Sequence, residues 1–458
     1  MHFLVRQCRF VALLCLLLLA WGCAKPQPVP IAPTPPPPPT GKGEVQDLRV
    51  LPQNLSAYLR PDTADRPLYP REQASVRMDA LRQTWLTPWN QTRPEYSRHA
   101  VEEIFHRFEK APGFGNNNQH NTPDFAASLH AAAGLGSYPN TMRKALTVTN
   151  TNLRGMPTHA PRFADPSLPG EGYPFDYLQH TALPPGTPIL VTHTSRDGSW
   201  VLAESALTFG WLPATDVAFV DDATAGQFVT GRLAAIIKDR TSLPEVGIVA
   251  DVGAFFPMAG APDASGVTLL VPRRGASGQA ELASVRLPAT AAVPMPMPMT
   301  PRNVAAVGNQ FMGKTYGWGG IDGKRDCSAL THDMFVPFGI YLPRNSASQA
   351  SSGGSIPLLD LDNAQKESTN LSQGVPFASL VWMKGHILVY VGEYKGHPVV
   401  YHDIWGLHTF SETGRDGRLV LGRAVVTTLR AGEENPRVGS PHILLNRVRS
   451  LSILARPN

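Results

Sequence analysis

The stretch YGWGGIDGKRDCSALTHDMFVPFG, residues 316–339, places one cysteine at the start of a predicted helix. Asp326 suits the N-cap position, because its side chain can accept a hydrogen bond from a free amide of the first turn. Apolar residues then recur near the helical period, at Leu330, Met334, Phe335 and Phe338. Gly339 is a typical helix stop. The pattern predicts that Cys327 lies in the first turn of a helix whose apolar face is buried.

A cysteine in that position is a candidate nucleophile. Helix N-terminal amides favour an anion, so we expect a lowered pKa for the Cys327 thiol. A thiolate still needs a partner that protonates the leaving amine, and histidine is the usual choice. His386 opens one apolar strand and His402 ends another, residues 398–402. In an antiparallel hairpin both would lie near the helix start, giving a Cys–His–polar constellation.

Other interpretations of these residues remain open. A single cysteine is most often a small buried apolar residue, and a histidine in a strand is more often structural than catalytic. The glycines of 317–320 could serve only to shape a turn. Zinc would be a rival use of His386, His397, His402 and His408, but their spacing fits no zinc motif, and we expect neither metal nor cofactor.

Several motifs in order resemble the NlpC-type cell-wall peptidases, which are papain-like cysteine enzymes that cut peptidoglycan stem peptides. They are Tyr-x-Trp-Gly-Gly, Asp-Cys-Ser, Gly-Ile-x-Leu-Pro-Arg-x-Ser-x-x-Gln from 339 to 349, and Gly-His before an apolar strand. The resemblance covers residues 300–425. Two departures are Ala329, where the family usually has glycine, and residues 375–380, which replace a Pro-Gly-Asp loop.

The resemblance implies roles residue by residue. Cys327 would be the nucleophile, His386 the general base and acid, and His402 the orienting group, with Asp403 as the alternative. The substrate-binding residues would be Tyr316, Trp318, Asp326 and Ser328. By that match, Asp326 would meet the free amine of a terminal L-Ala.

The implied reaction is hydrolysis of the γ-D-glutamyl–diaminopimelyl (or lysyl) bond of stem peptides, as in γ-D-glutamyl-L-diamino-acid endopeptidases. The expected partners are therefore peptidoglycan stem peptides or muropeptides. Two alternatives are a catalytically inactive wall-binding lipoprotein and an acyl transferase with the same fold.

The remainder of the chain predicts an α+β protein of several domains. Residues 45–144 indicate a helical unit, with an amphipathic helix at 97–110. Short apolar runs at 145–150, 188–193, 199–203 and 210–213 predict strands. They resemble a bacterial SH3 barrel over 145–225. A weaker match predicts a second barrel over 226–290, and the papain-like peptidase domain follows over 299–458.

The first residues are typical of an export signal. Residues 1–22 have a basic start and an apolar run. Gly22-Cys23-Ala24-Lys25 resembles a bacterial lipobox, which implies a lipid on Cys23 and a membrane anchor. The proline-rich residues 26–39 then predict an extended spacer within a 23–44 linker. We expect an exported, lipid-anchored protein, at the outer membrane facing the periplasm or elsewhere in the cell envelope.

The charge balance is mild. The chain has 41 Lys+Arg against 36 Asp+Glu over 458 residues. That excess is far short of a dense basic stripe, so we expect no nucleic-acid partner. We expect a monomer.

Overall fold

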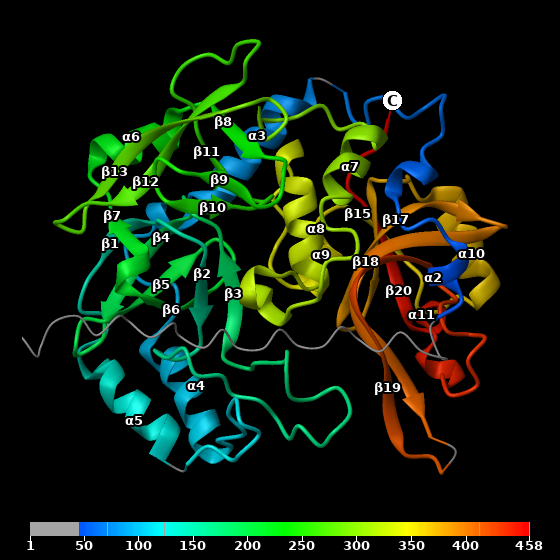
Figure 1. Cartoon of the computed structure of the whole chain (residues 1–458), viewed down its shortest axis with the longest axis horizontal. Coiled ribbons are helices and arrows are strands. Elements are labelled where there is room, and N and C mark those ends of the chain that lie inside the picture. Colours follow the sequence, from blue (N-terminus) through cyan, green and yellow to red (C-terminus); the bar gives the residue numbers. More distant parts are fainter. Residues whose placement is uncertain (1–44, 71, 123, 412, 458) are drawn as a thin grey trace, which may run out of the picture. The chain divides into compact units, whose positions relative to one another are not determined.

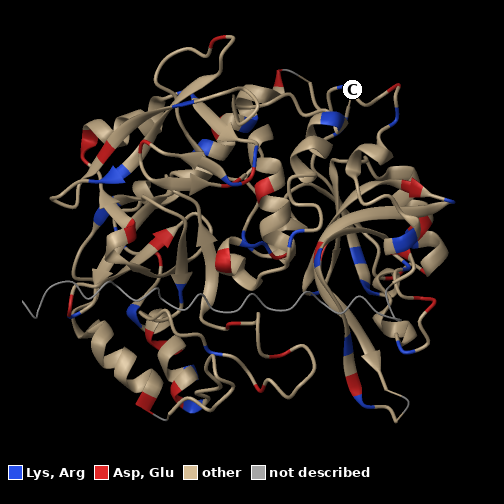
Figure 2. Ribbon diagram, in the orientation of Figure 1, with Lys and Arg blue, Asp and Glu red and all other residues tan. Residues whose placement is uncertain are grey.

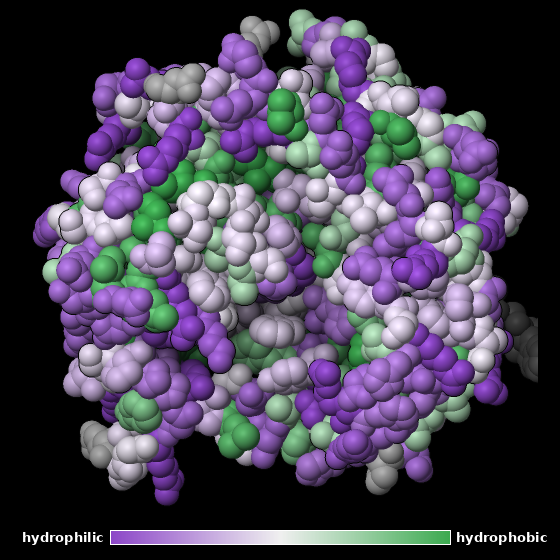
Figure 3. All heavy atoms as spheres, turned by 180° about the vertical axis from the view of Figure 1, so that it is seen from behind, coloured by the Kyte–Doolittle hydropathy of each residue, from purple (hydrophilic) through white to green (hydrophobic). Residues whose placement is uncertain are grey.

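The computed structural model describes residues 45–70, 72–122, 124–411 and 413–457, which all lie in one compact unit. The predicted signal, Cys23 and the proline-rich spacer lie outside the described residues. Among the helices of the described ranges, none is long and apolar enough to cross a membrane. Acidic and basic residues are interspersed over the ribbon in Figure 2. Hydrophilic residues predominate on the face shown in Figure 3, with apolar atoms in smaller patches.

The N-terminal part is helical, as predicted. Ser97 caps the predicted amphipathic helix by accepting a hydrogen bond from the Ala100 amide, and Val101, Phe105 and Phe108 are buried. The elements are α2 (Asp47–Val50), α3 (Gln73–Trp85), α4 (Arg98–Lys110), α5 (Asp124–Ala133) and the 3₁₀ helices η1 (Leu55–Tyr58), η2 (Thr87–Asn90) and η3 (Leu135–Ser137).

The next residues form a seven-stranded sheet in the order β3-β2-β6-β5-β4-β1-β7. Each of the four apolar runs predicted as strands contains a strand, although the run at 145–150 is a strand only to Thr147. Residues of each strand are buried in a shared core. The elements are β1 (Arg143–Thr147), β2 (Thr151–Arg154), β3 (Gln179–Leu183), β4 (Pro188–Thr194), β5 (Trp200–Ser205), β6 (Phe209–Pro213), η4 (Ala214–Asp216) and β7 (Val217–Phe219).

A second β region follows α6 (Asp222–Thr230). Its strands form three small sheets around a separate apolar core. They are β8 (Leu233–Ile236), β9 (Thr241–Leu243), β10 (Ile248–Ala250), β11 (Phe255–Pro257), β12 (Val267–Arg274), β13 (Ala280–Leu287) and β14 (Ala292–Pro294). We name residues 143–219 the first barrel and residues 233–294 the second barrel, after the two barrels that the sequence predicts.

The C-terminal domain packs α8 (Cys327–Phe335) against a six-stranded sheet of order β15-β20-β16-β17-β18-β19 (Figure 1). The strands are β15 (Gly354–Pro357), β16 (Ser379–Met383), β17 (His386–Tyr394), β18 (His397–Phe410), β19 (Asp416–Thr428) and β20 (Val448–Ile453). The helices are α7 (Pro301–Gly308), η5 (Trp318–Gly323), η6 (Val336–Phe338), α9 (Ser346–Gln349), α10 (Asn363–Gln373), η7 (Ser440–His442) and α11 (Leu444–Arg447).

One strand boundary differs from the prediction. β18 does not end at His402 but continues to Phe410, because it stays paired with β19 across a register shift between Ile404 and Gly406. The two strands form the long hairpin at the lower right of Figure 1.

The domains share apolar cores. One buried cluster combines Leu55 of the N-terminal part, Val252 of the second barrel and Leu330 of α8. Another combines Trp85 of α3, Leu146 of the first barrel and Val336 of the C-terminal domain. Removing any one domain would therefore expose apolar surface on the others.

Candidate active site

Cys327 is the first residue of α8, as predicted. Asp326 caps the helix, since its Oδ1 accepts a hydrogen bond from the Ala329 amide at 2.9 Å. The helix contacts both β17 and β18. The backbone N–H of Ile387 acts to lower the pKa of the Cys327 thiol, so the sulfur lies near the start of β17. Cys327 is buried, with 9% of its surface exposed.

The two predicted histidines lie in contact. His386 Nε2 lies 2.8 Å from His402 Nδ1, and His402 Nε2 lies 3.0 Å from Thr427 Oγ1. His402 and Thr427 are fully buried. With Nε2 of His386 engaged, Nδ1 is the ring nitrogen left for proton exchange with a thiol.

These contacts allow two proton arrangements, because Thr427 Oγ1 can either accept from His402 Nε2 or donate to it. When Thr427 accepts from His402 Nε2–H, His402 Nδ1 becomes an acceptor and His386 Nε2 must donate to it. His386 Nδ1 then carries a lone pair, which is the form a general base needs. Thr427 was not predicted, because it lies 25 residues after His402 and no local motif marks it.

The titration of the pair differs from the prediction. Burial raises the pKa of the Cys327 thiol to about 12, and the charge of Asp326 acts in the same direction. Burial lowers the pKa of His386 to about 3. The expected lowering of the thiol pKa by the helix terminus is thus outweighed by desolvation. The resting pair is a neutral thiol and a neutral imidazole.

Asp326 is fully engaged by neighbours. Arg344 donates to both of its oxygens, at 3.2 Å and 2.6 Å, and the Gly319 amide donates to Oδ2 at 3.0 Å. Ser328 donates to Oδ1 at 3.1 Å and accepts from Arg344 at 2.7 Å. Burial alone would raise the pKa of Asp326, but Arg344 and these hydrogen bonds hold it below its usual value. A substrate ammonium would have to share this carboxylate with Arg344.

Asp403 has the opposite environment. It is 2% exposed, and its Oδ1 is buried without a hydrogen-bond partner. Burial raises the pKa of Asp403 well above its usual value, and the charge of Asp326 adds to that shift. The charge of Asp403 also contributes to raising the pKa of Cys327 and the pKa of Tyr316. The hydrogen bond of His386 goes to His402 rather than to Asp403.

The paired glycines allow the first barrel to approach the nucleophile. Gly319 and Gly320 have φ of 62° and 79°, and a Cβ on Gly319 would lie 2.5 Å from the Gln179 side chain. Gln179 of β3 donates to the Gly319 carbonyl at 3.0 Å. Thr181 of the same strand accepts from Arg344 at 2.7 Å. The glycines therefore do more than shape a turn.

Aromatic side chains gather beside the site. Phe175, from the first barrel, lies between Tyr316 at 6.2 Å, Trp318 at 5.6 Å and Trp405 at 5.6 Å, measured between ring centroids. Trp318 is 36% exposed and also faces Tyr177. Of the predicted substrate residues, Tyr316 and Trp318 thus belong to an apolar surface built by two domains.

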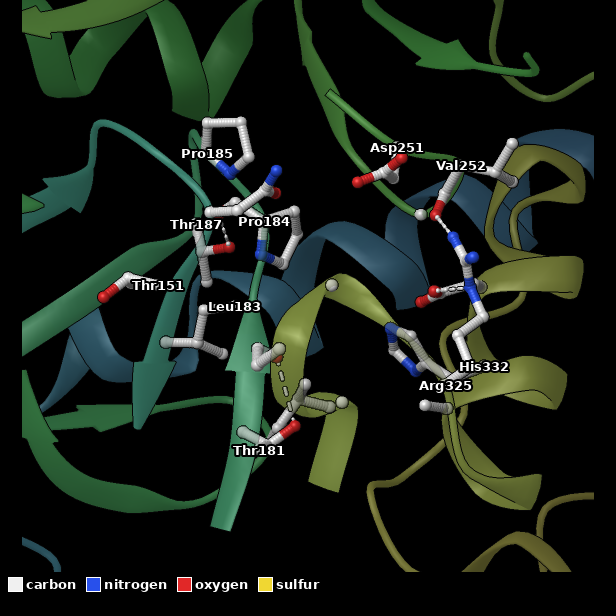
Figure 4. A pocket seen from close by; sticks show the side chains of 18 of the residues that line it. Thr151, Thr181, Leu183, Pro184, Pro185, Thr187, Asp251, Val252, Arg325 and His332 are labelled. Carbon is white, nitrogen blue, oxygen red and sulfur yellow. Dashed lines mark hydrogen bonds and ion pairs between the residues drawn. The ribbon is translucent and has the colours of Figure 1, made fainter. Parts of the chain in front are cut away.

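A separate cavity lies on another side of α8. Its volume is about 140 Å³, and it is lined by residues of the first barrel, of 251–255 and of α8 (Figure 4). Its lining includes Thr181, Arg325 and His332 but not Cys327.

The histidines weighed for zinc have separate partners. His386 contacts His402, His397 contacts Glu367, and His408 contacts Asp416.

Arg344 and Gln349 lie in the 339–349 motif that resembles the peptidase family, but no role was predicted for either residue. Gln349 is fully buried and donates to the carbonyls of Ser328 and Pro343, at 2.8 Å and 2.9 Å. These bonds tie the helix of Cys327 to the segment that carries Arg344. A motif alone shows which residues recur, not which atoms they meet.

Three family models match the chain. The NlpC/P60 family matches residues 313–402, the N-terminal NLPC_P60 stabilising domain matches 10–138, and an SH3 domain of the SH3b1 type matches 161–213. Comparison with curated proteins gives no match. The SH3 match falls on the first of the two predicted barrels.

One solved structure agrees with these matches. An NlpC/P60 endopeptidase from Photobacterium damselae subsp. piscicida has 25% identity and a TM-score of 0.80, covering 89% of this chain and 98% of that one. An NlpC/P60 family protein from Bacillus cereus has 16% identity and a TM-score of 0.41, covering 60% of this chain and 82% of that one. The predicted α+β fold is confirmed, with N-terminal helices, an SH3-like sheet region and a papain-like C-terminal domain.

Proposed function

Because the C-terminal domain is an NlpC/P60 domain and the chain is a cysteine peptidase of the cell wall, we propose that it hydrolyses the γ-D-glutamyl-L-diamino-acid bond of stem peptides. The third stem residue would be diaminopimelate or lysine. The observation that carries the proposal is the series of contacts from His386 through His402 to Thr427, beside a cysteine at the start of α8 whose thiol lies near Ile387, the residue after His386.

The residues support a two-step mechanism. As Cys327 Sγ attacks the γ-carbonyl carbon, its proton passes to His386 Nδ1, because the resting thiol is neutral. The imidazolium then gives that proton to the leaving amine as the C–N bond breaks, leaving a thioester. Water attacks the thioester, His386 accepts its proton, and the thiolate leaves and is protonated again. The Cys327 N–H at the start of α8 is a suitable donor to the oxyanion.

We further propose that the preferred stem has a free N-terminal L-Ala. Asp326 is occupied by Arg344, whereas Asp403 Oδ1 has no partner. An ammonium beside Asp403 would stabilise its carboxylate form and satisfy that oxygen. Phe175 and Trp318 add apolar surface on the side of the first barrel. Such a peptidase would act on wall fragments during recycling or remodelling.

Export and anchoring through a lipid on Cys23 complete the proposal. They rest on the lipobox resemblance and the proline-rich residues 26–39. Acyl chains on one residue anchor a protein firmly when more than one is present.

Mass spectrometry of two substrates tests the reaction. The full chain is incubated with L-Ala-γ-D-Glu-diaminopimelate and with the same stem joined to muramic acid. Release of L-Ala-D-Glu from the free stem alone, absent in Cys327→Ala, supports the whole proposal. Cleavage of both stems would remove the preference for a free amine. Cleavage of neither by folded, reduced protein would favour a binding lipoprotein, and an acyl-acceptor product would indicate a transferase.

A further inference from the structure

The helical N-terminal part holds a histidine–glutamate–histidine cluster that the peptidase chemistry does not use. His106 and Glu109 lie one turn apart on α4, and His130 comes from α5, which packs against α4. His106 Nδ1 lies 3.1 Å from Glu109 Oε2, and His130 Nδ1 lies 3.1 Å from Oε1. The three ligand atoms all lie within 4.8 Å of one another.

We propose that His106, Glu109 and His130 form a zinc-binding site that joins α4 to α5. Imidazole nitrogens and carboxylate oxygens are usual zinc ligands, and bonds of about 2.0–2.1 Å place tetrahedral ligand atoms about 3.3 Å apart. The nitrogen–oxygen distances, one to each oxygen of the Glu109 carboxylate, are close to that spacing, and the three ligand atoms start within 4.8 Å of one another. Both distances are also longer than the roughly 2.7–2.9 Å of a charge-assisted hydrogen bond, so the Glu109 carboxylate does not form a strong hydrogen bond to either imidazole.

The ligands are held in place before any ion binds. The His130 ring stacks on Phe105 with centroids 4.8 Å apart and planes at 21°, and Phe105 is fully buried. His106 and Glu109 are fixed relative to each other by their helix. Binding then requires that each imidazole carries its proton on Nε2, so that the Nδ1 lone pair faces the ion.

The site is open to solvent. The side chains of His106, Glu109 and His130 are 45%, 31% and 24% exposed, which leaves room for water as a fourth ligand. A hollow of about 370 Å³ beside Glu109 and His130 gives an entry path. Two arginines also line it: Arg98, which is paired with Glu102 at 2.8 Å, and Arg196.

The ion would act on stability rather than on hydrolysis. α4 and α5 pack into a core with Met156, Leu202 and Trp211 of the first barrel, whereas Cys327 belongs to another core. Figure 1 shows α4 and α5 below the first barrel and apart from α8. A zinc ion there would cross-link two helices that are otherwise joined by apolar packing and these hydrogen bonds.

Calorimetric titration of ZnCl₂ into the chelator-treated full chain, with alanine in place of Cys8, Cys15, Cys23 and Cys327, tests the site without interference from thiols. We expect one ion per chain. Glu109→Gln and His130→Gln should each weaken binding at least about tenfold. His99→Gln, at an exposed position of the same helix, is the matched control and should bind as the parent does. Zinc should raise the Tm of the parent and of His99→Gln but not that of His130→Gln.

X-ray absorption of the zinc complex gives a direct reading of the ligands. Two imidazoles and one carboxylate in the parent, with one imidazole fewer in His130→Gln, would support the site. No uptake of zinc, or uptake that Glu109→Gln and His130→Gln leave unchanged, would overturn it. Circular dichroism checks that each variant is folded, and His106→Gln replaces any that is not.

Discussion

Replacing Arg325 by methionine should destabilise the whole chain, because this guanidinium joins the C-terminal domain to the second barrel. Its Nη1 and Nη2 donate to the two oxygens of Asp239, at 3.0 Å and 2.9 Å. Its Nε donates to Asp333 at 2.6 Å, and Nη2 also donates to the Val252 carbonyl at 2.8 Å. The Arg325 side chain is 8% exposed.

Removing one partner of a buried ion pair costs about 3–5 kcal/mol, because the other charge stays buried. Two features place the expected loss of stability for Arg325→Met at the lower end of this range. Lys314 also contacts Asp239 and would still neutralise it. Burial raises the pKa of Asp333 to about 6, so this group can take up a proton instead of remaining charged. The loss of the guanidinium contact with the Phe311 ring, at 4.0 Å, adds a smaller cost. We expect about 3 kcal/mol in total.

Urea unfolding followed by tryptophan fluorescence measures this difference. One main transition is expected, because the cores combine residues of several domains. The control is Arg273→Met in the second barrel, whose pair with Glu281 is 56% and 52% exposed. The free energy of unfolding of Arg273→Met should stay within about 1 kcal/mol of the parent value. The reasoning fails if Arg325→Met is no less stable than Arg273→Met.

Three further predictions concern the site. Thr427→Val should lower kcat about 10- to 100-fold by freeing His402 to turn, and Thr427→Ser should restore it in the same assay. Asp403→Asn should lower kcat/KM for the free stem at least about tenfold, with the N-acetylated stem unchanged; equal losses on both would argue against amine binding. For His386, whose pKa falls from 6.5 to about 3 on folding, the unfolded chain binds the extra proton below pH 6.5. This group alone should therefore lower the free energy of unfolding by about 1.4 kcal/mol per pH unit as the pH drops from 6.5 toward 3, which denaturation at several pH values measures.

Local signals in the sequence carried much of the fold. The N-cap of Asp326, the apolar spacing after Cys327 and the amphipathic helix of 97–110 are short-range patterns, and all three elements form as predicted. The β-runs of the first barrel are equally local. The predicted end of β18 at His402 was wrong. The strand continues because it pairs with β19 beyond His402, and that pairing is not visible in the local sequence of β18.

The site was predictable only in part. The contact of His386 with His402 follows from the hairpin, but Thr427 required knowledge of the third strand. The wrong sign for the thiol pKa has the same origin: a helix terminus is visible in sequence, whereas burial of Cys327 depends on every neighbouring element. The contacts of Gln179 and Thr181 with the nucleophile region cross more than 130 residues of chain.

Three consecutive residues around the nucleophile are tied to different parts of the molecule. Arg325 is hydrogen-bonded to the second barrel. Asp326 is paired with Arg344, which also donates a hydrogen bond to Thr181 of the first barrel, and Cys327 lies near the start of β17. A partly synthesised or partly folded chain lacks at least one of these supports. The hydrolase is thus expected to become competent only when both barrels have docked on the C-terminal domain, so that a partly folded chain cleaves nothing.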